Sequence, residues 1–400
     1  MIARKNLLNK ATLAVITFAV AITPSAQAAP KTIAIKPFVQ LTKDVTAEGM
    51  VVTSKAIITY ANIVGQSSDI QLRAIDFAGA QIWSKTIDSG RDEVATAINV
   101  DAQGSIWLAG NSASATPAET FTAIAGALNP DSVTVEIPIE IRGDMKNISL
   151  WQFSLSGDLL SETDLKITQP ALIDGISVNK TGASVLLSRE SGQSLALVKA
   201  GKLEKEIKIG TIKSKFNVIF RGADGSTSLF GSSSETLGGK KLAGKVDGIL
   251  LKVSKTGSIS SVVRSSAAGA IRDWQSATAT NFLTGVVKSG TKIETAITKF
   301  NPSFVPTWTT RFPSTGTSLA APGANGSVFA IFEPTTALKG VTGFKQKKGQ
   351  SVALQFDSKG ILIGAFTDLL LSNPFAAGYS AGAGLVVLTS SGDILRAKSL

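Results

Sequence analysis

Carboxylates supply the main catalytic chemistry open to this chain, because it contains no histidine and no cysteine. That composition excludes thiolate nucleophiles, disulfides, Ser-His-Asp triads and proton transfer by histidine. Three acids lie close together at Asp88, Asp92 and Glu93. Glycoside hydrolysis needs two carboxyl groups roughly 5–10 Å apart, so these acids are the candidate pair. The alternative is that they form solvated turns. We assign no catalytic residue and expect a protein that is not an enzyme.

Lysines gather in two segments and indicate a different chemistry, the attraction of anions. The members are Lys240, Lys241 and Lys245 in segment 234–247, and Lys345, Lys347 and Lys348, with Lys339, in segment 333–350. Clustered lysines create a field that salt screens, which suits an anionic envelope polymer or an acidic protein surface. The alternative is that exposed loops carry lysine for solubility. The formal net charge is +11, yet no basic run or aromatic-studded basic face indicates nucleic acid.

One acid and aromatic pair, Asp273 and Trp274, has the residue types that could hold a sugar. The alternative is that Trp274 packs between sheets, as the other tryptophans do. The candidate binding residues are therefore Trp274 and six lysines from the two segments: Lys240, Lys241, Lys245, Lys345, Lys347 and Lys348. Asp101 and Asp224 stand in isolated turns without the spaced carboxylates of a calcium loop. We therefore predict no metal site and no cofactor.

Internal repeats indicate the elements that position these residues. A glycine turn followed by β-branched and aromatic residues recurs at 104–112, 182–188, 225–233, 280–285, 326–332 and 384–390, with a weaker copy at 55–61. Each of the first six units continues with a strand, a turn and a strand, and the turn at 301–304 lacks the usual glycine. Four short strands per repeat are typical of a propeller blade. The chain is 44% hydrophobic, enough for a packed core.

We predict an all-β fold, a seven-bladed β-propeller of four-stranded antiparallel blades. The last unit lacks one strand, and segment 32–40 is a strand candidate that belongs to no unit. Pairing this N-terminal strand with the C-terminal strands would complete the last blade and remove free sheet edges.

Two stretches resemble secreted bacterial β-propeller repeats. Residues 72–83 read LRAIDFAGAQIW and residues 100–111 read VDAQGSIWLAGN. The second is similar to the SBBP repeat, and the first to the strand-turn-strand phrase of pyrroloquinoline-quinone-type propellers. The resemblance implies a propeller fold and a secreted setting. It does not imply the quinone, because no residues that would hold it can be matched.

The N-terminus has the pattern of a secretory signal peptide. Basic residues at the start are followed by an apolar stretch at 11–22 and by the small-residue triplet Ala26-Gln27-Ala28, which predicts cleavage after Ala28. The apolar stretch is shorter than the ~20 residues that cross a bilayer. We therefore expect a signal peptide at 1–28 and one propeller domain at 29–400. The mature protein would be secreted or otherwise extracytoplasmic, monomeric and without a transmembrane segment.

Long links interrupt alternate repeats and predict where ligands bind. Insertions near 114–147, 234–247 and 333–350 separate the second and third strands of their units, whereas the other units have tight links. All such links should emerge on the face that also carries the connections between blades. Long loops on a rigid scaffold concentrate recognition, so we predict a non-catalytic binding or scaffolding module that uses this face. The alternative is a carboxylate-dependent glycoside hydrolase or lyase acting on an extracellular polysaccharide.

Overall fold

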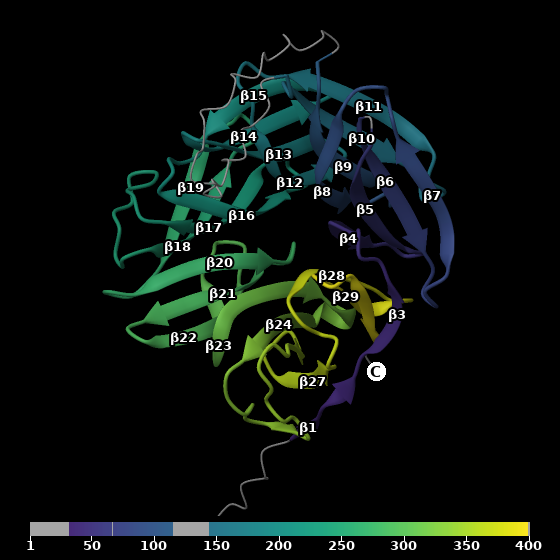
Figure 1. The fold of residues 1–400 in the computed structure, drawn as a ribbon. Coiled ribbons are helices and arrows are strands. Elements are labelled where there is room, and N and C mark those ends of the chain that lie inside the picture. Colours follow the sequence, from purple (N-terminus) through teal and green to yellow (C-terminus); the bar gives the residue numbers. More distant parts are fainter. Residues whose placement is uncertain (1–31, 66, 115–143, 399–400) are drawn as a thin grey trace, which may run out of the picture.

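Short antiparallel sheets stand around a common centre in the computed structural model (Figure 1). The structure describes residues 32–65, 67–114 and 144–398. The predicted signal peptide at 1–28 lies outside the described residues, as does segment 115–143 of the first insertion. No helix among the described residues is long and apolar enough to cross a membrane. The fold is an all-β propeller with four-stranded blades.

Five of the sheets are four-stranded and form separate blades. The first contains β4 (Gly49–Val52), β5 (Ile57–Val64), β6 (Ser68–Ile75) and β7 (Gln81–Ile87). The second contains β8 (Glu93–Val100), β9 (Ile106–Ser112), β10 (Asn147–Phe153) and β11 (Leu159–Lys166). The third contains β12 (Leu172–Asn179), β13 (Gly182–Arg189), β14 (Gly192–Lys199) and β15 (Lys202–Lys208). The fourth contains β16 (Ser214–Arg221), β17 (Thr227–Ser233), β18 (Asp247–Val253) and β19 (Ile259–Ser265). The fifth contains β28 (Pro374–Ser380), β29 (Gly384–Thr389), β30 (Asp393–Ala397) and β3 (Val39–Lys43).

The prediction of seven four-stranded blades is wrong, because the remaining large sheet has eight strands. Its members are β20 (Ile271–Ala277), β21 (Phe282–Ser289), β22 (Lys292–Phe300), β23 (Pro306–Pro322), β24 (Val328–Pro334), β26 (Val352–Phe356), β27 (Leu362–Thr367) and β2 (Lys36–Pro37). The sequence predicted two strands and a link where β23 lies. Instead β23 pairs with β22 through Pro313 and with β24 from Ser314 onward, so one strand joins both halves. A two-stranded parallel sheet of β1 (Ile33–Ala34) and β25 (Val341–Thr342) lies beside it.

Pairing of the two chain ends closes the ring, as predicted. Strand β3 pairs antiparallel with β30, from Val39 opposite Arg396 to Lys43 opposite Asp393. The pairing begins later than the predicted segment 32–40, because β1 and β2 pair in parallel with β25 and β27 instead. Gln40 Nε2 donates a hydrogen bond to Asp393 Oδ1 at 2.8 Å, which ties the closing strand to a buried carboxylate.

The core lies between neighbouring sheets, and its sequence pattern follows each strand's place. The second and third strands are almost wholly buried, as in β29 and β26. The fourth strand is mostly exposed, as in β15, where Leu203 and Ile207 are partly buried against the core, because one of its faces covers the core and the other is at the rim. Figure 1 shows β7, β11 and β15 at the rim and β4, β8 and β12 toward the centre.

Among the described residues, the turns between third and fourth strands share one geometry except for the two-residue turn Ala200-Gly201 between β14 and β15. Asp76 Oδ1 accepts hydrogen bonds from the backbone N–H groups of Ala78 and Ala80, each at 2.8 Å, and Gly79 has a φ of 96°. In the copy without glycine, Asn301 takes the acceptor role, and Phe304 occupies the glycine position with a φ of 59°. The Phe304 ring is buried edge-on against Phe230, which compensates for the left-handed backbone that glycine would adopt without cost.

Antiparallel pairing gives the ring two distinct faces. Turns between the first and second strands, and between the third and fourth, emerge on one face, which we call the hairpin face. Links between the second and third strands emerge on the other, together with the connections from one sheet to the next. We call this second face the insertion face, because the links at 234–246 and 335–351 lie on it.

Candidate binding site

The six predicted lysines are all exposed, and they lie in two separate loops of the insertion face. Lys240, Lys241 and Lys245 lie between β17 and β18, whereas the three lysines of the 340s lie between β24 and β26. Strands β20 to β22 stand between the two loops (Figure 1). None of the six forms an ion pair with a carboxylate of the described chain within 4.0 Å. The structure therefore places the lysines on one face without joining them into one site.

The acids of these loops hold the loops in shape. Asp247 accepts hydrogen bonds from the backbone N–H groups of Ala243 at 2.9 Å and Gly244 at 2.7 Å, and pairs with Arg264 at 3.0 Å. Burial alone would raise the pKa of Asp247, but these donors hold it below its ordinary value. Glu333 accepts a hydrogen bond from Gly349 N–H at 2.6 Å. The carboxylates are thus engaged with their own loops, which leaves the nearby lysines facing solvent.

Trp274 belongs to the core. Its side chain is fully buried, with the ring edge-on to Phe300 at 5.6 Å and the Arg272 guanidinium 4.7 Å from the ring centre. This placement corrects its use as a candidate binding residue, because the indole has no surface to offer a sugar. Trp274 instead packs in the core, which was the alternative interpretation of this residue.

The three neighbouring acids differ in exposure: Asp88 is exposed, Asp92 is half-buried and Glu93 is buried. Asp88 accepts a hydrogen bond from Gly90 N–H at 2.8 Å, and Asp92 accepts one from Ser68 N–H at 2.7 Å. Glu93 is 0% exposed, and its Oε2 atom has no hydrogen-bond partner among the described residues. Burial raises the pKa of Glu93, against the lowering effect of a hydrogen bond from Ser89. A buried Glu93 cannot reach a polysaccharide. No group of acids among the described residues could hold a metal ion.

A set of β-bulges marks the insertion-face part of the central strands. The pairing of first and second strands skips one residue in four sheets, at Thr96, Asp174, Asn217 and Phe375. In the eight-stranded sheet it skips Gln275 in β20 and residues 315–317 in β23. A bulge frees a residue from the ladder and re-aims its side chain, and bulges are frequent beside active sites. The bulges therefore bring polar side chains of different sheets toward the same face.

Two of the bulge side chains, those of Thr96 and Asn217, contact the first strand of the next sheet. Thr96 Oγ1 donates to Ile173 O at 2.6 Å. Asn217 Nδ2 donates to Trp274 O at 2.8 Å and to Asp273 Oδ1 at 3.1 Å. Burial raises the pKa of Asp273, although the Asn217 contact and the charge of Lys215 act in the opposite direction. These contacts fix the polar groups on the rigid centre of the ring.

A cavity of about 550 Å³ opens at these bulges. Thr96, Asp174 and Asn217 line it, together with Arg189, Gln193 and Lys215. Gln193 Nε2 donates to Asp174 Oδ2 at 2.5 Å, and Arg189 pairs with Glu206. Asp174 and Lys215 are both exposed and have no ion-pair partner within 4.0 Å in the described chain. The cavity thus offers an ammonium group and a carboxylate that are not ion-paired to each other or to other described residues, the carboxylate being held by hydrogen bonds from Gln193 and Ser188. Such a mixture of charged and polar groups suits a polar ligand.

A second cavity of about 330 Å³ lies at the bulges of β23 and β28. Residues Thr315, Thr317, Phe375 and Glu333 line part of it. Two cavities of the insertion face therefore use the same structural device in different sheets.

The sequence contained a signal for these positions that the loop-based argument missed. A polar residue interrupts an apolar run soon after each connection, as in Ile173-Asp174-Gly175 and Phe216-Asn217-Val218. A repeated polar residue inside a buried strand is a sequence sign of a bulge or of a functional side chain.

Fold and cavities together define the class of protein, a β-propeller with polar cavities at its central strands. No protein family model and no curated protein matches this chain. Solved structures do match. A streptogramin B lyase has a TM-score of 0.51 at 11% identity, covering 90% of this chain and 96% of the other. The β-propeller domain of Cps50 (Swd1) from Myceliophteria thermophila has a TM-score of 0.51 at 10% identity, covering 90% and 100%. A chain of the mitotic checkpoint complex has a TM-score of 0.50 at 11% identity, covering 98% and 100%. At these identities the likeness concerns the fold alone.

Proposed function

We propose that this protein is a secreted, non-catalytic binding module that acts as a monomer outside the cytoplasmic membrane. Its ligand would be a component of the cell envelope, either an anionic polymer or another protein, held at the insertion face. The signal-like pattern at 1–28 and the resemblance to secreted repeats support the location. The observation that carries the binding role is the 550 Å³ cavity at the bulges, where Asp174 and Lys215 are the charged groups without an ion-pair partner among the described residues.

The cavity favours binding over hydrolysis. Asp174 is the one carboxylate among the described residues that line it, whereas glycoside hydrolysis uses two carboxyl groups flanking the bond. The acids at 88–93, the candidate pair, are held in turns or buried. The polysaccharide hydrolase or lyase is therefore not our proposal.

Cosedimentation of the purified protein with an envelope fraction from its own cells tests the proposal. We expect Asp174→Asn and Lys215→Gln each to weaken binding by about tenfold, because each removes a charged hydrogen-bonding group from the cavity. Asp158→Asn is the matched control, since Asp158 lies in an exposed turn of the hairpin face. Changing Lys240, Lys241 and Lys245 to Gln together should mainly reduce the sensitivity to salt.

Two results would overturn this assignment. The first is an unchanged bound fraction in both cavity variants, whatever the bound fraction of Asp158→Asn. The second is no sedimentation of the wild-type protein with any envelope fraction. Fractionation of the cells, with sequencing of the mature N-terminus, tests the predicted export and the cleavage after Ala28.

A further inference from the structure

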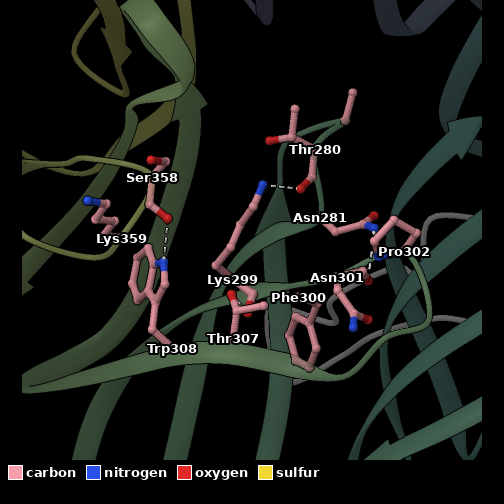
Figure 2. A pocket seen from close by; sticks show the side chains of 11 residues that line it. Thr280, Asn281, Lys299, Phe300, Asn301, Pro302, Thr307, Trp308, Ser358 and Lys359 are labelled. Atoms are coloured by element: carbon pink, nitrogen blue, oxygen red, sulfur yellow. Dashed lines mark hydrogen bonds between the residues drawn. The ribbon is translucent and has the colours of Figure 1, made fainter.

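A cleft of about 610 Å³ opens on the hairpin face, opposite the insertion face. One wall contains Thr280 and Asn281 from the turn between β20 and β21, with Lys299 at the end of β22 (Figure 2). Trp308 of β23 and the turn residue Ser358 form the other wall (Figure 2). Trp308 Nε1 donates to Ser358 O at 3.2 Å, so the second wall is tied together across two halves of the sheet.

Lys299 is a partly buried cation without a counter-ion. Its Nζ donates to the backbone carbonyl of Thr280 (Figure 2). No carboxylate of the described chain lies within 4.0 Å of it. Burial lowers the pKa of Lys299, as expected for an ammonium group withdrawn from water. An ammonium group has three N–H donors, so two remain for a ligand.

The charge of the cleft has one sign. Among the described residues that line it, Lys299 and Lys359 are the charged ones, and none is Asp or Glu. A cation that has lost part of its hydration is stabilised by an anion that reaches it. Lys359 differs from Lys299, because Figure 2 shows its amino group on the far side of the Trp308 ring. Lys299 is therefore the group placed to contact an anion inside the cleft.

The remaining lining groups suit a ring that carries hydroxyl groups. The partly buried Trp308 and the exposed Pro302 supply apolar surface, and Asn281, Asn301, Thr307 and Ser358 supply polar atoms. Thr307 Oγ1 donates to Lys299 O at 3.0 Å, and Asn301 Oδ1 accepts from Val305 N–H at 2.9 Å. These contacts fix the walls before a ligand arrives, which reduces the entropy lost on binding. The volume exceeds that needed for an inorganic ion.

We propose that this cleft binds an anionic monosaccharide unit, with the carboxylate or phosphate group of the sugar on Lys299 and its ring against Trp308. The site lies on the other face from the proposed envelope-binding cavity, so either assignment can fail without the other.

Isothermal titration calorimetry of the purified full chain tests the site with four probes: glucuronate, glucose 6-phosphate, glucose and inorganic phosphate. We expect at least one anionic sugar to bind about tenfold more tightly than either glucose or inorganic phosphate. Lys299→Gln should weaken that binding by about tenfold or more, since it removes a charge-assisted hydrogen bond. Lys359→Gln, with the same loss of charge at the same cleft, should change it by less than about threefold. The preferred anionic sugar identifies the charged group.

Lys299→Arg is a second control, because it changes the same residue but keeps its positive charge. It should bind the anionic sugar more tightly than Lys299→Gln does. Circular dichroism is used to check that each variant has the same melting temperature as the wild type before its binding is compared. The proposal is overturned if neither anionic sugar binds, if glucose or phosphate alone binds as tightly, or if Lys299→Gln and Lys359→Gln cause equal losses. Asp174→Asn should leave the titration unchanged.

Discussion

Glu93 shows at the level of a single residue how the ring tolerates a buried acid. It is the first residue of β8, and Ser89 donates a hydrogen bond to its Oε1 while Oε2 has no partner. Burial raises its pKa, because the charged form is poorly solvated there. In the unfolded chain the same carboxyl has an ordinary pKa of about 4.3. The folded protein thus binds this proton more tightly than the unfolded chain does.

This difference predicts a pH dependence that Glu93→Gln should remove. A raised folded-state pKa contributes stability that is fully present below the unfolded pKa and is lost as the pH rises through the folded pKa. The free energy of unfolding of the wild type should therefore fall relative to that of Glu93→Gln as the pH increases above about 4.3. Urea denaturation across pH 4 to 8 measures it. Exposed Glu190→Gln controls for the loss of one charge. A difference that stays flat with pH contradicts the prediction.

Strands are held to the next sheet by side chains that replace backbone partners. Gln193 of β14 is buried, its Oε1 accepts from Phe216 N–H at 2.6 Å, and its Nε2 donates to Phe216 O at 3.1 Å. Asn62 makes the same pair of contacts with Ala95, at 2.8 and 2.9 Å. In both cases the clamped residue directly precedes the bulge residue. We call this pair of side-chain contacts a clamp. It supplies hydrogen-bond partners to backbone groups at the position where the bulge interrupts the ladder.

We expect Gln193→Leu to destabilise the protein by about 2–5 kcal/mol, because it leaves two buried backbone groups without partners. It also removes a donor from Asp174 in the binding cavity. Exposed Gln169→Leu is the control and should change the free energy of unfolding by less than about 0.5 kcal/mol. Urea denaturation gives both values. Equal effects of the two substitutions would show that the clamp contributes nothing.

The strands themselves were predicted from sequence, whereas their irregularities were missed, because a polar residue within one strand indicates a bulge only when it recurs in several repeats. Alternating Val, Ile and Phe with glycine turns fixed the rhythm of repeats such as 182–199 and 225–253. A bulge changes the register by one residue, and Asp174 inside a strand also fits ordinary alternation, so composition alone does not reveal it. Residues 313–317 look like a link because they contain Pro313 and Gly316, yet they remain part of β23. These residues stay in one strand because β23 pairs with β22 on one side and with β24 on the other.

The sequence predicted only part of the candidate site, for a related reason. Loop length placed the 234–246 and 335–351 links on one face, since antiparallel pairing determines where links emerge. The cavity at Asp174 and the cleft at Lys299 instead depend on neighbouring sheets, and both combine residues far apart in the chain. A single sequence gives the order of strands but not which side chains of adjacent sheets meet.

At the scale of the whole molecule, the fold depends on the pairing of β3 with β30, which closes the ring. Among the described strands, β3 alone covers the outer edge of β30, and an uncovered edge can pair with other chains. Phe38, directly before β3, is buried and packs edge-on to Phe366 at 6.2 Å. In contrast β1 and β2 contribute two residue pairs each, in parallel pairing. The stability of the ring should therefore depend on residues 38–43 far more than on residues 29–37.

Two truncations separate these contributions. A chain that begins at residue 38 keeps Phe38 and β3, and its melting temperature should remain within a few degrees of that of the chain beginning at residue 29, since it loses only short edge pairings. A chain that begins at residue 44 loses the β3 ladder and the Gln40 hydrogen bond to Asp393. We expect it to be less stable by about 3 kcal/mol or more and to aggregate through the edge of β30. Thermal unfolding and light scattering measure both effects. If both truncated chains melt together and stay monomeric, pairing of the chain ends does not stabilise the ring.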